Sequence, residues 1–409
     1  MKALRFNPTI PRYAAGLALG KIREDFFWSG LSCTTFEDVP EPELIGDEWV
    51  IIKTRYGGIC GSDMSAIRLH ASPYLTPLTS YPFTFGHENV GVIARVGPAV
   101  ERFSEGERVV VEPTLWCRPR GFEDLCPFCQ RGETNRCERV TQGILSPSLS
   151  IGFSKDTGGS WSQYFLAHQS QLFRIPDSLS DENGLMVEPF ATGLHAVLNN
   201  QPAGDDSILV IGAGTIALCT LGAMRAFGLK NRIHVLARYP FQAEAARRLG
   251  ADEVILASGG ADYYAEVSRL SGAQILEPVI GKRMLLGGYD QVYECVGSDT
   301  SLDDALRFTN NGGLVVLVGV PGIAKGVDWS AIFIHELQLK SSYIYNHADM
   351  INGRQRSTFD ISIDWMAQGR VDLGWMVTHR FKLEEYRQAL ALQSKRAENQ
   401  SFKTVFEFE

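Results

Sequence analysis

The residues best suited to chemistry in this chain are a thiol, an imidazole and carboxylates in short motifs. Cys60 lies in the segment GGICGSD, His87 and Glu88 lie in GHEN, and Glu188 directly precedes a proline. A catalytic zinc typically takes three protein ligands from Cys, His and Asp or Glu, and it keeps one position open for water or substrate. The residue types therefore indicate an open zinc site, although Cys60 and His87, considered singly, are also compatible with burial in a core.

A second set of thiols crowds into a stretch rich in charged residues, Pro and Gly. Its spacing is C-x8-C-x2-C-x7-C, and it consists of Cys117, Cys126, Cys129 and Cys137. Four thiolates suit a closed tetrahedral zinc that braces a loop with no core of its own. Because the chain is long and we expect a reducing environment, this pattern favours a structural zinc over disulfides or unbound thiols.

A glycine-rich turn follows an apolar stretch, SILVI, that predicts a buried strand. Gly212, Gly214, Thr215 and Ile216 belong to GAGTIA, which fits the pattern G-x-G-x-x-G/A and opens a helical stretch closed by Gly228. The first glycine permits the tight turn, the second lets the backbone approach a pyrophosphate, and the helix N-terminus offers N–H groups to that anion. We therefore predict cofactor binding here rather than a merely structural turn.

The end of the next expected strand, RIHVLA, bears on which nicotinamide cofactor binds. An Asp or Glu at this place bonds a ribose hydroxyl, whereas an Arg accommodates a 2'-phosphate. Here Ala237 is followed by Arg238 and Tyr239, so NADP(H) is favoured over NAD(H). The alternative is that Arg238 is an ordinary solvated residue at the start of a helix.

Two domains are expected from the length of 409 residues and from a change of pattern near Glu188. Short strands and turns come first, and strands and helices then alternate in the βαβ rhythm of a parallel sheet covered by helices. We predict a β-rich catalytic domain of residues 1–187 and 342–409 and a dinucleotide-binding domain of residues 188–341. An insertion is expected near residues 258–288, because the connection there is longer than one crossover helix requires.

Charge and hydropathy exclude several classes of partner. The formal net charge is -8, which disfavours a general attraction to nucleic acid or anionic lipid. No apolar stretch reaches the length of about 18 residues that a membrane-spanning helix needs, and the first residues lack the pattern of a signal peptide. We therefore expect a cytoplasmic protein with no nucleic-acid or membrane partner.

The segment GHENVGVIARVGPAV fits the zinc alcohol dehydrogenase signature G-H-E-x2-G-x5-G-x2-V at every fixed position. From about residue 30 onward the chain resembles the zinc-dependent medium-chain dehydrogenases of the alcohol dehydrogenase superfamily, most of all their sorbitol and threonine dehydrogenase branch. The resemblance implies an α/β fold, with a GroES-like β-rich catalytic domain and a Rossmann domain containing a doubly wound parallel sheet. In its cysteine cluster the family usually has two residues between the first two thiols, whereas eight separate Cys117 from Cys126 here.

The same resemblance implies roles for the site residues. Cys60, His87 and Glu188 are the implied ligands of a catalytic zinc, and Glu88 is a residue that approaches the metal or exchanges with water. Ser62 matches the hydroxyl that passes the alcohol proton along a relay, although it also suits the cap of a helix beginning near the next residue.

Together these features predict a zinc-dependent alcohol or polyol dehydrogenase, or a carbonyl reductase, that transfers hydride between its substrate and NADP(H). The zinc is expected to act as a Lewis acid on the substrate oxygen. The alternatives are an NAD-linked sorbitol- or threonine-type dehydrogenase, a zinc-free reductase of the same superfamily, and a non-catalytic protein on the same fold. The resemblance also implies one catalytic and one structural zinc, a small-molecule alcohol or carbonyl substrate, and a homo-dimer or homo-tetramer.

Overall fold

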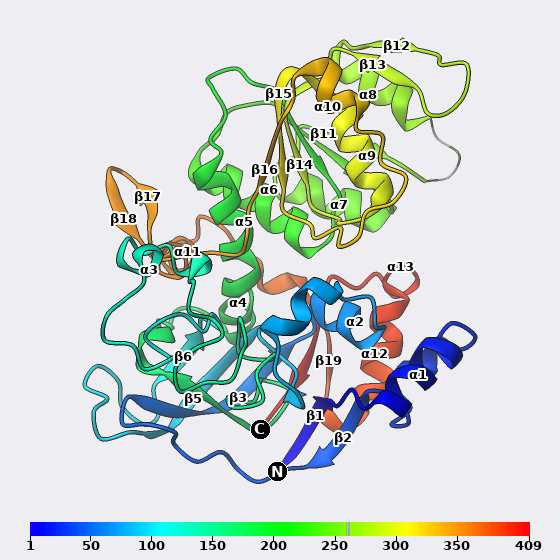
Figure 1. The fold of residues 1–409 in the computed structure, drawn as a ribbon. Coiled ribbons are helices and arrows are strands. Elements are labelled where there is room, and N and C mark those ends of the chain that lie inside the picture. Colours follow the sequence, from blue (N-terminus) through cyan, green and yellow to red (C-terminus); the bar gives the residue numbers. More distant parts are fainter. Residues whose placement is uncertain (259, 261) are drawn as a thin grey trace. The chain divides into compact units, whose positions relative to one another are not determined.

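The computed structural model describes residues 1–258, 260 and 262–409, and the chain divides into two compact units (Figure 1). Their segments are Met1–Glu188, Asn346–Ala348 and Phe359–Glu409 in the first unit, and Pro189–Tyr345 and Asp349–Thr358 in the second unit. The predicted domains follow the same order along the chain. The structure differs from them in counting Glu188 with the first unit and residues 342–345 and 349–358 with the second unit.

The first unit is built on a large sheet with the strand order β19-β20-β3-β5-β6-β8, in which β7 pairs with β3. Its strands are β3 (Trp49–Gly58), β5 (Asn89–Val96), β6 (Arg108–Val111), β7 (Tyr164–His168), β8 (Leu172–Arg174), β19 (Val377–Phe381) and β20 (Lys403–Glu407). A smaller sheet has the order β2-β1-β4. Its strands are β1 (Lys2–Phe6), β2 (Thr34–Asp38) and β4 (Phe83–Thr84).

Strand pairing in the large sheet decides which strand ends lie next to one another. β3 pairs antiparallel with β5, with Gly57 opposite Asn89, and antiparallel with β20, with Gly58 opposite Val405. The buried indole of Trp161 supports this corner, because its Nε1 donates to the carbonyl of Gly58 over 2.9 Å. The residues that follow β3, precede β5 and begin β20 therefore lie together.

Helices of the first unit are mostly short. They are α1 (Ile10–Leu19), α2 (Gly61–Ile67), α3 (Pro127–Gln130), α4 (Asp181–Leu185), α11 (Thr358–Ala367), α12 (Tyr386–Ser394) and α13 (Arg396–Asn399). An aromatic cluster in the core includes Phe6, Phe83, Phe85 and Trp161. Across the described residues, no helix is both long enough and apolar enough to cross a membrane.

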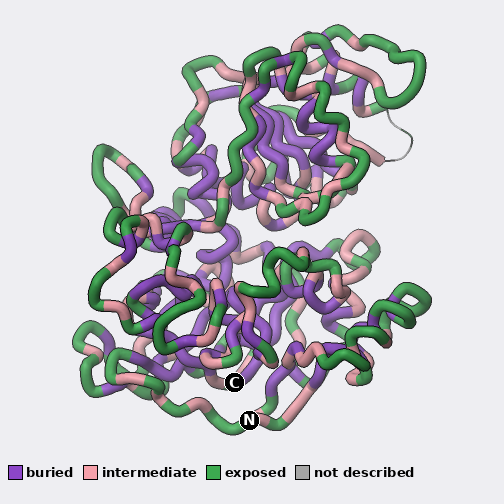
Figure 2. Tube along the Cα trace, in the orientation of Figure 1, coloured by how far each residue is buried: buried purple, intermediate pink, exposed green. Residues whose placement is uncertain are grey.

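The second unit contains a parallel sheet with the strand order β11-β10-β9-β14-β15-β16. The strands are β9 (Ile208–Ile211), β10 (Ile233–Ala237), β11 (Glu253–Leu256), β14 (Tyr289–Glu294), β15 (Thr309–Leu317) and β16 (Gln338–Ser341). The helices are α5 (Val187–Asn199), α6 (Thr215–Phe227), α7 (Pro240–Arg248), α8 (Tyr263–Ser271), α9 (Asp299–Phe308) and α10 (Ser330–His335). Every residue of β9 and β10 is buried, and Figure 2 shows this buried centre of the sheet. The order is that of a doubly wound dinucleotide-binding fold, which confirms the predicted fold class.

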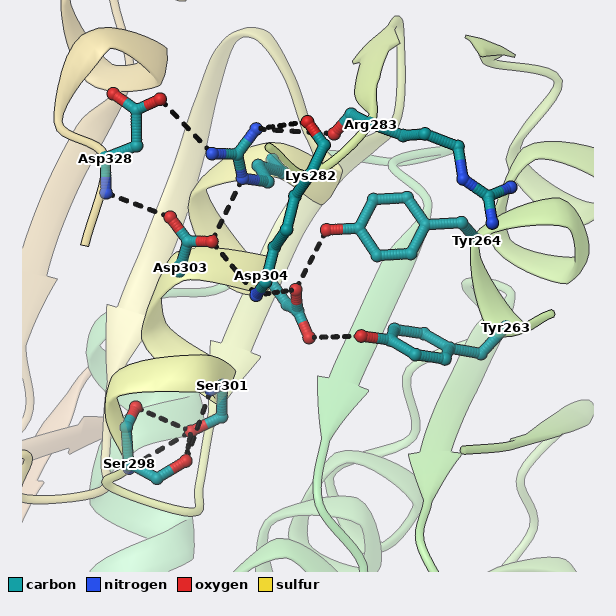
Figure 3. A network of polar contacts seen from close by, with 10 residues as sticks. Tyr263, Tyr264, Lys282, Arg283, Ser298, Ser301, Asp303, Asp304 and Asp328 are labelled. Carbon is teal, nitrogen blue, oxygen red and sulfur yellow. Dashed lines mark hydrogen bonds and ion pairs between the residues drawn. The ribbon is translucent and has the colours of Figure 1, made fainter. Parts of the chain in front are cut away.

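The connection between β11 and β14 holds α8 and a hairpin of β12 (Gln274–Leu276) and β13 (Met284–Leu286). This is the region of the predicted insertion near 258–288, in which residues 259 and 261 lie outside the described ones. Figure 3 shows how the hairpin is tied to α9: Lys282 Nζ lies 3.0 Å from Asp303 and 2.8 Å from Asp304. A further hairpin consists of β17 (Asp349–Ile351) and β18 (Arg354–Arg356).

Candidate functional site

Two of the implied zinc ligands, Cys60 and His87, meet the neighbouring carboxylate Glu88 in the first unit. Cys60, His87 and Glu88 each offer a ligand atom, and these atoms all lie within 4.8 Å of one another. The sheet explains the arrangement, because Cys60 follows β3 by two residues and Glu88 stands directly before β5. A backbone hydrogen bond from Gly58 N to Glu88 O, 3.0 Å long, holds the end of β3 next to the start of β5. A soft thiolate, an imidazole and a carboxylate form a donor set that suits zinc.

Asp63 orients two of these groups. Its Oδ2 accepts a hydrogen bond from the backbone N–H of Cys60 over 2.9 Å, and its Oδ1 lies 3.5 Å from His87 Nδ1. The carboxyl group is fully buried. An acidic partner on one ring nitrogen leaves the other free for a metal and fixes the plane of the ring, as second-layer groups commonly do at zinc sites.

Electrostatics at His87 also suit a cation. Burial disfavours the charged imidazole, but the Asp63 carboxylate and Cys60 outweigh it and raise the pKa of His87 well above its usual value. The side chain is buried, and its Nδ1 faces Asp63 Oδ1 at 3.5 Å as an ion pair that is too long for a hydrogen bond. The negative groups around the ring therefore favour positive charge at this point.

Ser62 faces the same imidazole from α2. Its Oγ lies 3.4 Å from His87 Nε2. The helix begins at Gly61 with Cys60 as its N-cap residue, so Ser62 stands inside the helix and does not cap it. Its hydroxyl is thus beside the ligand group and is available for hydrogen bonding there.

Glu88 is engaged by a buried lysine that sequence reasoning missed. Lys403 Nζ lies 2.6 and 2.7 Å from the two carboxylate oxygens, and both side chains are buried. Burial lowers the pKa of Lys403, but the charge on Glu88 overcomes this and raises the pKa above its usual value, so the lysine stays charged. Gly58 leaves room for the carboxylate, since a Cβ at this position would collide with Glu88 Oε2.

Glu188 takes a different position. It is the second residue of α5, and its side chain is 7% exposed. Among the described residues, the group of ligand atoms formed by Cys60 and His87 includes Glu88 and does not include Glu188. The structure thus brings together two of the three implied ligands and adds the carboxylate next to His87.

The four thiols of the second set form a compact cluster. The four sulfur atoms lie within 4.8 Å of one another, and they belong to Cys117, Cys126, Cys129 and Cys137. All four side chains are buried, and none is in a disulfide. Cys117 Sγ lies 3.7 Å from Cys137 Sγ. Tetrahedral zinc with Zn–S bonds of about 2.3 Å needs sulfurs about 3.8 Å apart. The longer spacing after Cys117 therefore does not remove this thiol from the cluster.

The thiols of the cluster differ in their pKa values. Hydrogen bonding from Cys129 lowers the pKa of Cys137 to about 6, whereas burial raises the pKa of Cys117 to about 11. Cys137 is therefore the thiol that most readily forms the thiolate, the form that binds metals. The loop around the cluster is organised by Arg120, which is fully buried and donates to the carbonyls of Leu115 over 2.9 Å and Gln142 over 2.9 Å. No local pattern in the sequence distinguishes Arg120 from a surface arginine.

The glycine turn in the second unit has the predicted geometry. Gly212 follows β9 with φ of 103°, a left-handed conformation that favours glycine. Gly214 is the N-cap residue of α6, and a Cβ built there meets nothing within 4 Å, so the backbone is open to a close approach. Thr215 and Ile216 are the first residues of the helix, whose N-terminal N–H groups suit an anion.

Arg238 and Tyr239 stand where β10 ends and α7 begins. Arg238 is exposed, and its guanidinium carbon lies 5.5 Å from the centroid of the Tyr239 ring. In the part of the chain that the structure describes, Arg238 forms no ion pair, whereas many other arginines pair with a carboxylate. Its charge is therefore open to a ligand or to solvent.

Comparisons with known proteins agree with this architecture. Residues 46–177 match the family of the alcohol dehydrogenase GroES-like domain, and residues 215–357 match that of the zinc-binding dehydrogenases. Sorbitol dehydrogenase from Bacillus subtilis (strain 168) is 31% identical over 367 residues, which cover 88% of this chain and 90% of that protein. L-Threonine 3-dehydrogenase from Marinomonas sp. (strain MWYL1) is 28% identical over 351 residues, with 86% and 90% covered.

A solved structure shows the same fold. A putative zinc-binding dehydrogenase from Sinorhizobium meliloti 1021, bound to NADP, superposes with a TM-score of 0.72 at 24% identity and covers 100% of this chain and 99% of its own. The GroES-like and Rossmann-type parts that the sequence predicted are thus confirmed. The chain belongs to the zinc-dependent medium-chain dehydrogenases of the alcohol dehydrogenase superfamily, and it is an oxidoreductase that acts on the CH–OH group of small-molecule alcohols with zinc and a nicotinamide cofactor.

Proposed function

We propose that the chain is an NADP(H)-dependent alcohol or polyol dehydrogenase, or carbonyl reductase in the reverse direction, with its catalytic zinc at Cys60 and His87. The observation that carries this proposal is the convergence of Cys60, His87 and Glu88 within 4.8 Å. Zinc, when bound, supplies a Lewis acid for the substrate oxygen. The nicotinamide supplies the carbon that accepts or donates hydride.

The chain's own residues prepare this chemistry. Asp63 holds the Cys60 backbone and faces His87 Nδ1, so the two ligands keep their orientation. Ser62 Oγ, beside His87 Nε2, is placed to accept the proton of a substrate hydroxyl and pass it on. In the reverse direction the same hydroxyl returns the proton to the alcohol.

The third ligand is a carboxylate. The geometry supports Glu88, while the resemblance implied Glu188, so the two compete for this position in the proposal. Lys403 holds Glu88 at 2.6 Å and would have to release one of its oxygens for it to ligate. The zinc content of the variants Glu88→Gln and Glu188→Gln distinguishes them: the variant of the true ligand should lose about one zinc per chain, and the other variant should keep it.

The cofactor proposal rests on Arg238. Its unpaired charge at the end of β10 supports recognition of a 2'-phosphate, with Tyr239 beside it, and the turn at Gly212 and Gly214 supports binding of the pyrophosphate. The similar Sinorhizobium meliloti protein was solved with NADP. Initial rates with NADPH and NADH on a panel of aldehydes, ketones, alcohols and polyols test both the activity and the preference. Equal or better kcat/KM with NADH rules out the NADP(H) assignment.

We also propose two zinc ions per chain, one at the ligand group and one at the cluster of Cys117, Cys126, Cys129 and Cys137. The sulfur spacing supports the second site. Metal analysis of the purified protein tests the count. If the wild-type protein holds one zinc per chain and a variant without the Cys60 thiol holds the same amount, only the cysteine cluster binds zinc and the proposal of two ions is wrong.

A homo-oligomer is proposed through the edge of the parallel sheet. β16 is the last strand of the sheet, all of its residues are exposed, and the adjoining α10 exposes Phe333 (86%) and Ile334 (63%). A second copy related by a two-fold axis would pair with this edge and cover the apolar residues. Light scattering tests this: Phe333→Glu with Ile334→Glu should yield monomers, and an unchanged mass excludes this edge as the interface.

A further inference from the structure

A second cation is linked to the chain segment of the ligand group through a short series of hydrogen bonds and has no role in the proposed chemistry. Arg396 is the first residue of α13 and is half-buried. A chain of contacts locates it: Ile59, next to Cys60, donates its N–H to Thr404 O over 2.9 Å, and Thr404 Oγ1 lies 3.1 Å from the Gln393 amide. With the Gln393 amide turned so that its nitrogen donates to Thr404 Oγ1, the Gln393 oxygen accepts from Arg396 Nη2 over 2.6 Å and from Nε over 3.0 Å.

The two cations at this site differ in their partners. Lys403 is neutralised by Glu88 at 2.6 Å. Arg396 has no carboxylate within ion-pair distance in the described residues, and its guanidinium bonds only the neutral amide of Gln393. This contact uses two of the five N–H donors of the guanidinium. The remaining donors and the full positive charge are therefore free for a ligand.

Charge interactions agree with a place close to the ligand group. Burial lowers the pKa of Arg396, and the charges of Cys60 and Glu88 oppose this by raising it. A partly desolvated cation with no counter-ion is unfavourable, and an anion that binds it gains more than it would at an exposed lysine. The planar guanidinium fits a carboxylate or phosphate through two parallel hydrogen bonds.

We propose that Arg396 binds an anionic substituent of the substrate, so that this dehydrogenase prefers alcohols that carry a carboxylate or a phosphate over neutral alcohols. The inference rests on the proposed function, because it assigns the substrate class of the same site. Arg396 contributes to substrate specificity by binding this anionic group and takes no part in the hydride or proton transfer. A neutral polyol leaves the guanidinium unpaired, whereas an anionic one pairs with it.

The test compares matched substrates in the zinc-loaded enzyme. A polyol, its monophosphate and the corresponding aldonic acid are assayed with wild type, Arg396→Gln and Arg396→Lys, and Arg387→Gln serves as a control at an exposed arginine of α12. We expect Arg396→Gln to lower kcat/KM for the anionic substrates about 10- to 100-fold and to change the neutral one less than about 3-fold. Arg396→Lys should keep part of the preference, because it retains charge without the planar fork.

A second readout needs no turnover. Binding of inorganic sulfate is measured by calorimetry, and Arg396→Gln should weaken it about 10-fold or more while Arg387→Gln leaves it unchanged. Equal losses for neutral and anionic substrates, or unchanged sulfate binding, overturn the inference. A rise in KM confined to the nicotinamide cofactor also overturns it and assigns the guanidinium to the cofactor pyrophosphate. Failure of wild type to oxidise any alcohol with either cofactor refutes the proposed function instead, and the sulfate measurement still tests Arg396.

Discussion

The pair of Lys403 and Glu88 allows a quantitative prediction about the corner of the sheet that carries the ligand group. Lys403→Met removes the cation and keeps a side chain of similar length, so that the Glu88 carboxylate stays buried without its counter-charge. The two groups are 2.6 Å apart, and their side chains are only 3% and 1% exposed. Solvent therefore screens this pair very little, unlike the surface ion pairs of the chain.

The expected loss in the free energy of unfolding depends on the attraction between the two charges and on the hydration that each charge gives up on burial. With an effective dielectric constant of about 20, unit charges 2.6 Å apart attract by about 6 kcal/mol. Loss of one partner forfeits this attraction without restoring the hydration of the other, and such losses measure about 3–5 kcal/mol. The double variant Lys403→Met with Glu88→Gln removes both charges and should recover at least about 2 kcal/mol of that loss.

Urea unfolding measures both values, after dialysis against a chelator has removed the catalytic zinc from every variant. For a slope of about 2–3 kcal/mol/M, Lys403→Met should lower the midpoint by about 1–2 M. The raised pKa of Lys403 means that its contribution is complete below its unfolded pKa, near about 10.4, and is lost only as pH rises through the higher folded value. The difference in urea midpoint between wild type and Lys403→Met should therefore be the same at pH 7 and pH 9. Additive losses in the double variant would refute the coupling.

Three further outcomes are expected. Cys129→Ser should remove about one zinc per chain by metal analysis and expose the surrounding loop to proteolysis, and full zinc content would exclude a four-thiolate site. Arg238→Asp should lower kcat/KM with NADPH about 10- to 100-fold relative to NADH, and an unmoved ratio would contradict the role of Arg238. Glu112, which lies 2.6 Å from His347 Nε2, raises the pKa of that histidine despite its burial. Stability from this pair is therefore complete below about pH 6.5 and is lost as pH rises through the higher folded pKa, and His347→Gln should abolish that loss in thermal unfolding measured between pH 6 and 9.

Local sequence patterns determined much of the second unit. The apolar run before Gly212 forms β9, and the helical stretch after it forms α6, which ends as predicted with Gly228 in a left-handed conformation, φ 96°. Such features follow from periodicity and from the conformational freedom of glycine, which act over a few residues. The GHEN and cysteine motifs similarly marked the residues that form the two ligand groups, because metal donors are rare and their types are specific.

Only the tertiary structure decided which groups meet across long separations. Lys403 stands 315 residues from Glu88, and nothing in the segment SFKTVF distinguishes a buried ion-paired lysine from one at a strand edge. Arg396 and Gln393 likewise acquire their significance from the pairing of β20 with β3, which brings the end of the chain to Cys60. The grouping of Glu88 rather than Glu188 with Cys60 and His87 has the same origin. A sequence records which donors and charges are available, but distances between them arise from strand register and packing, which depend on contacts between distant parts of the chain.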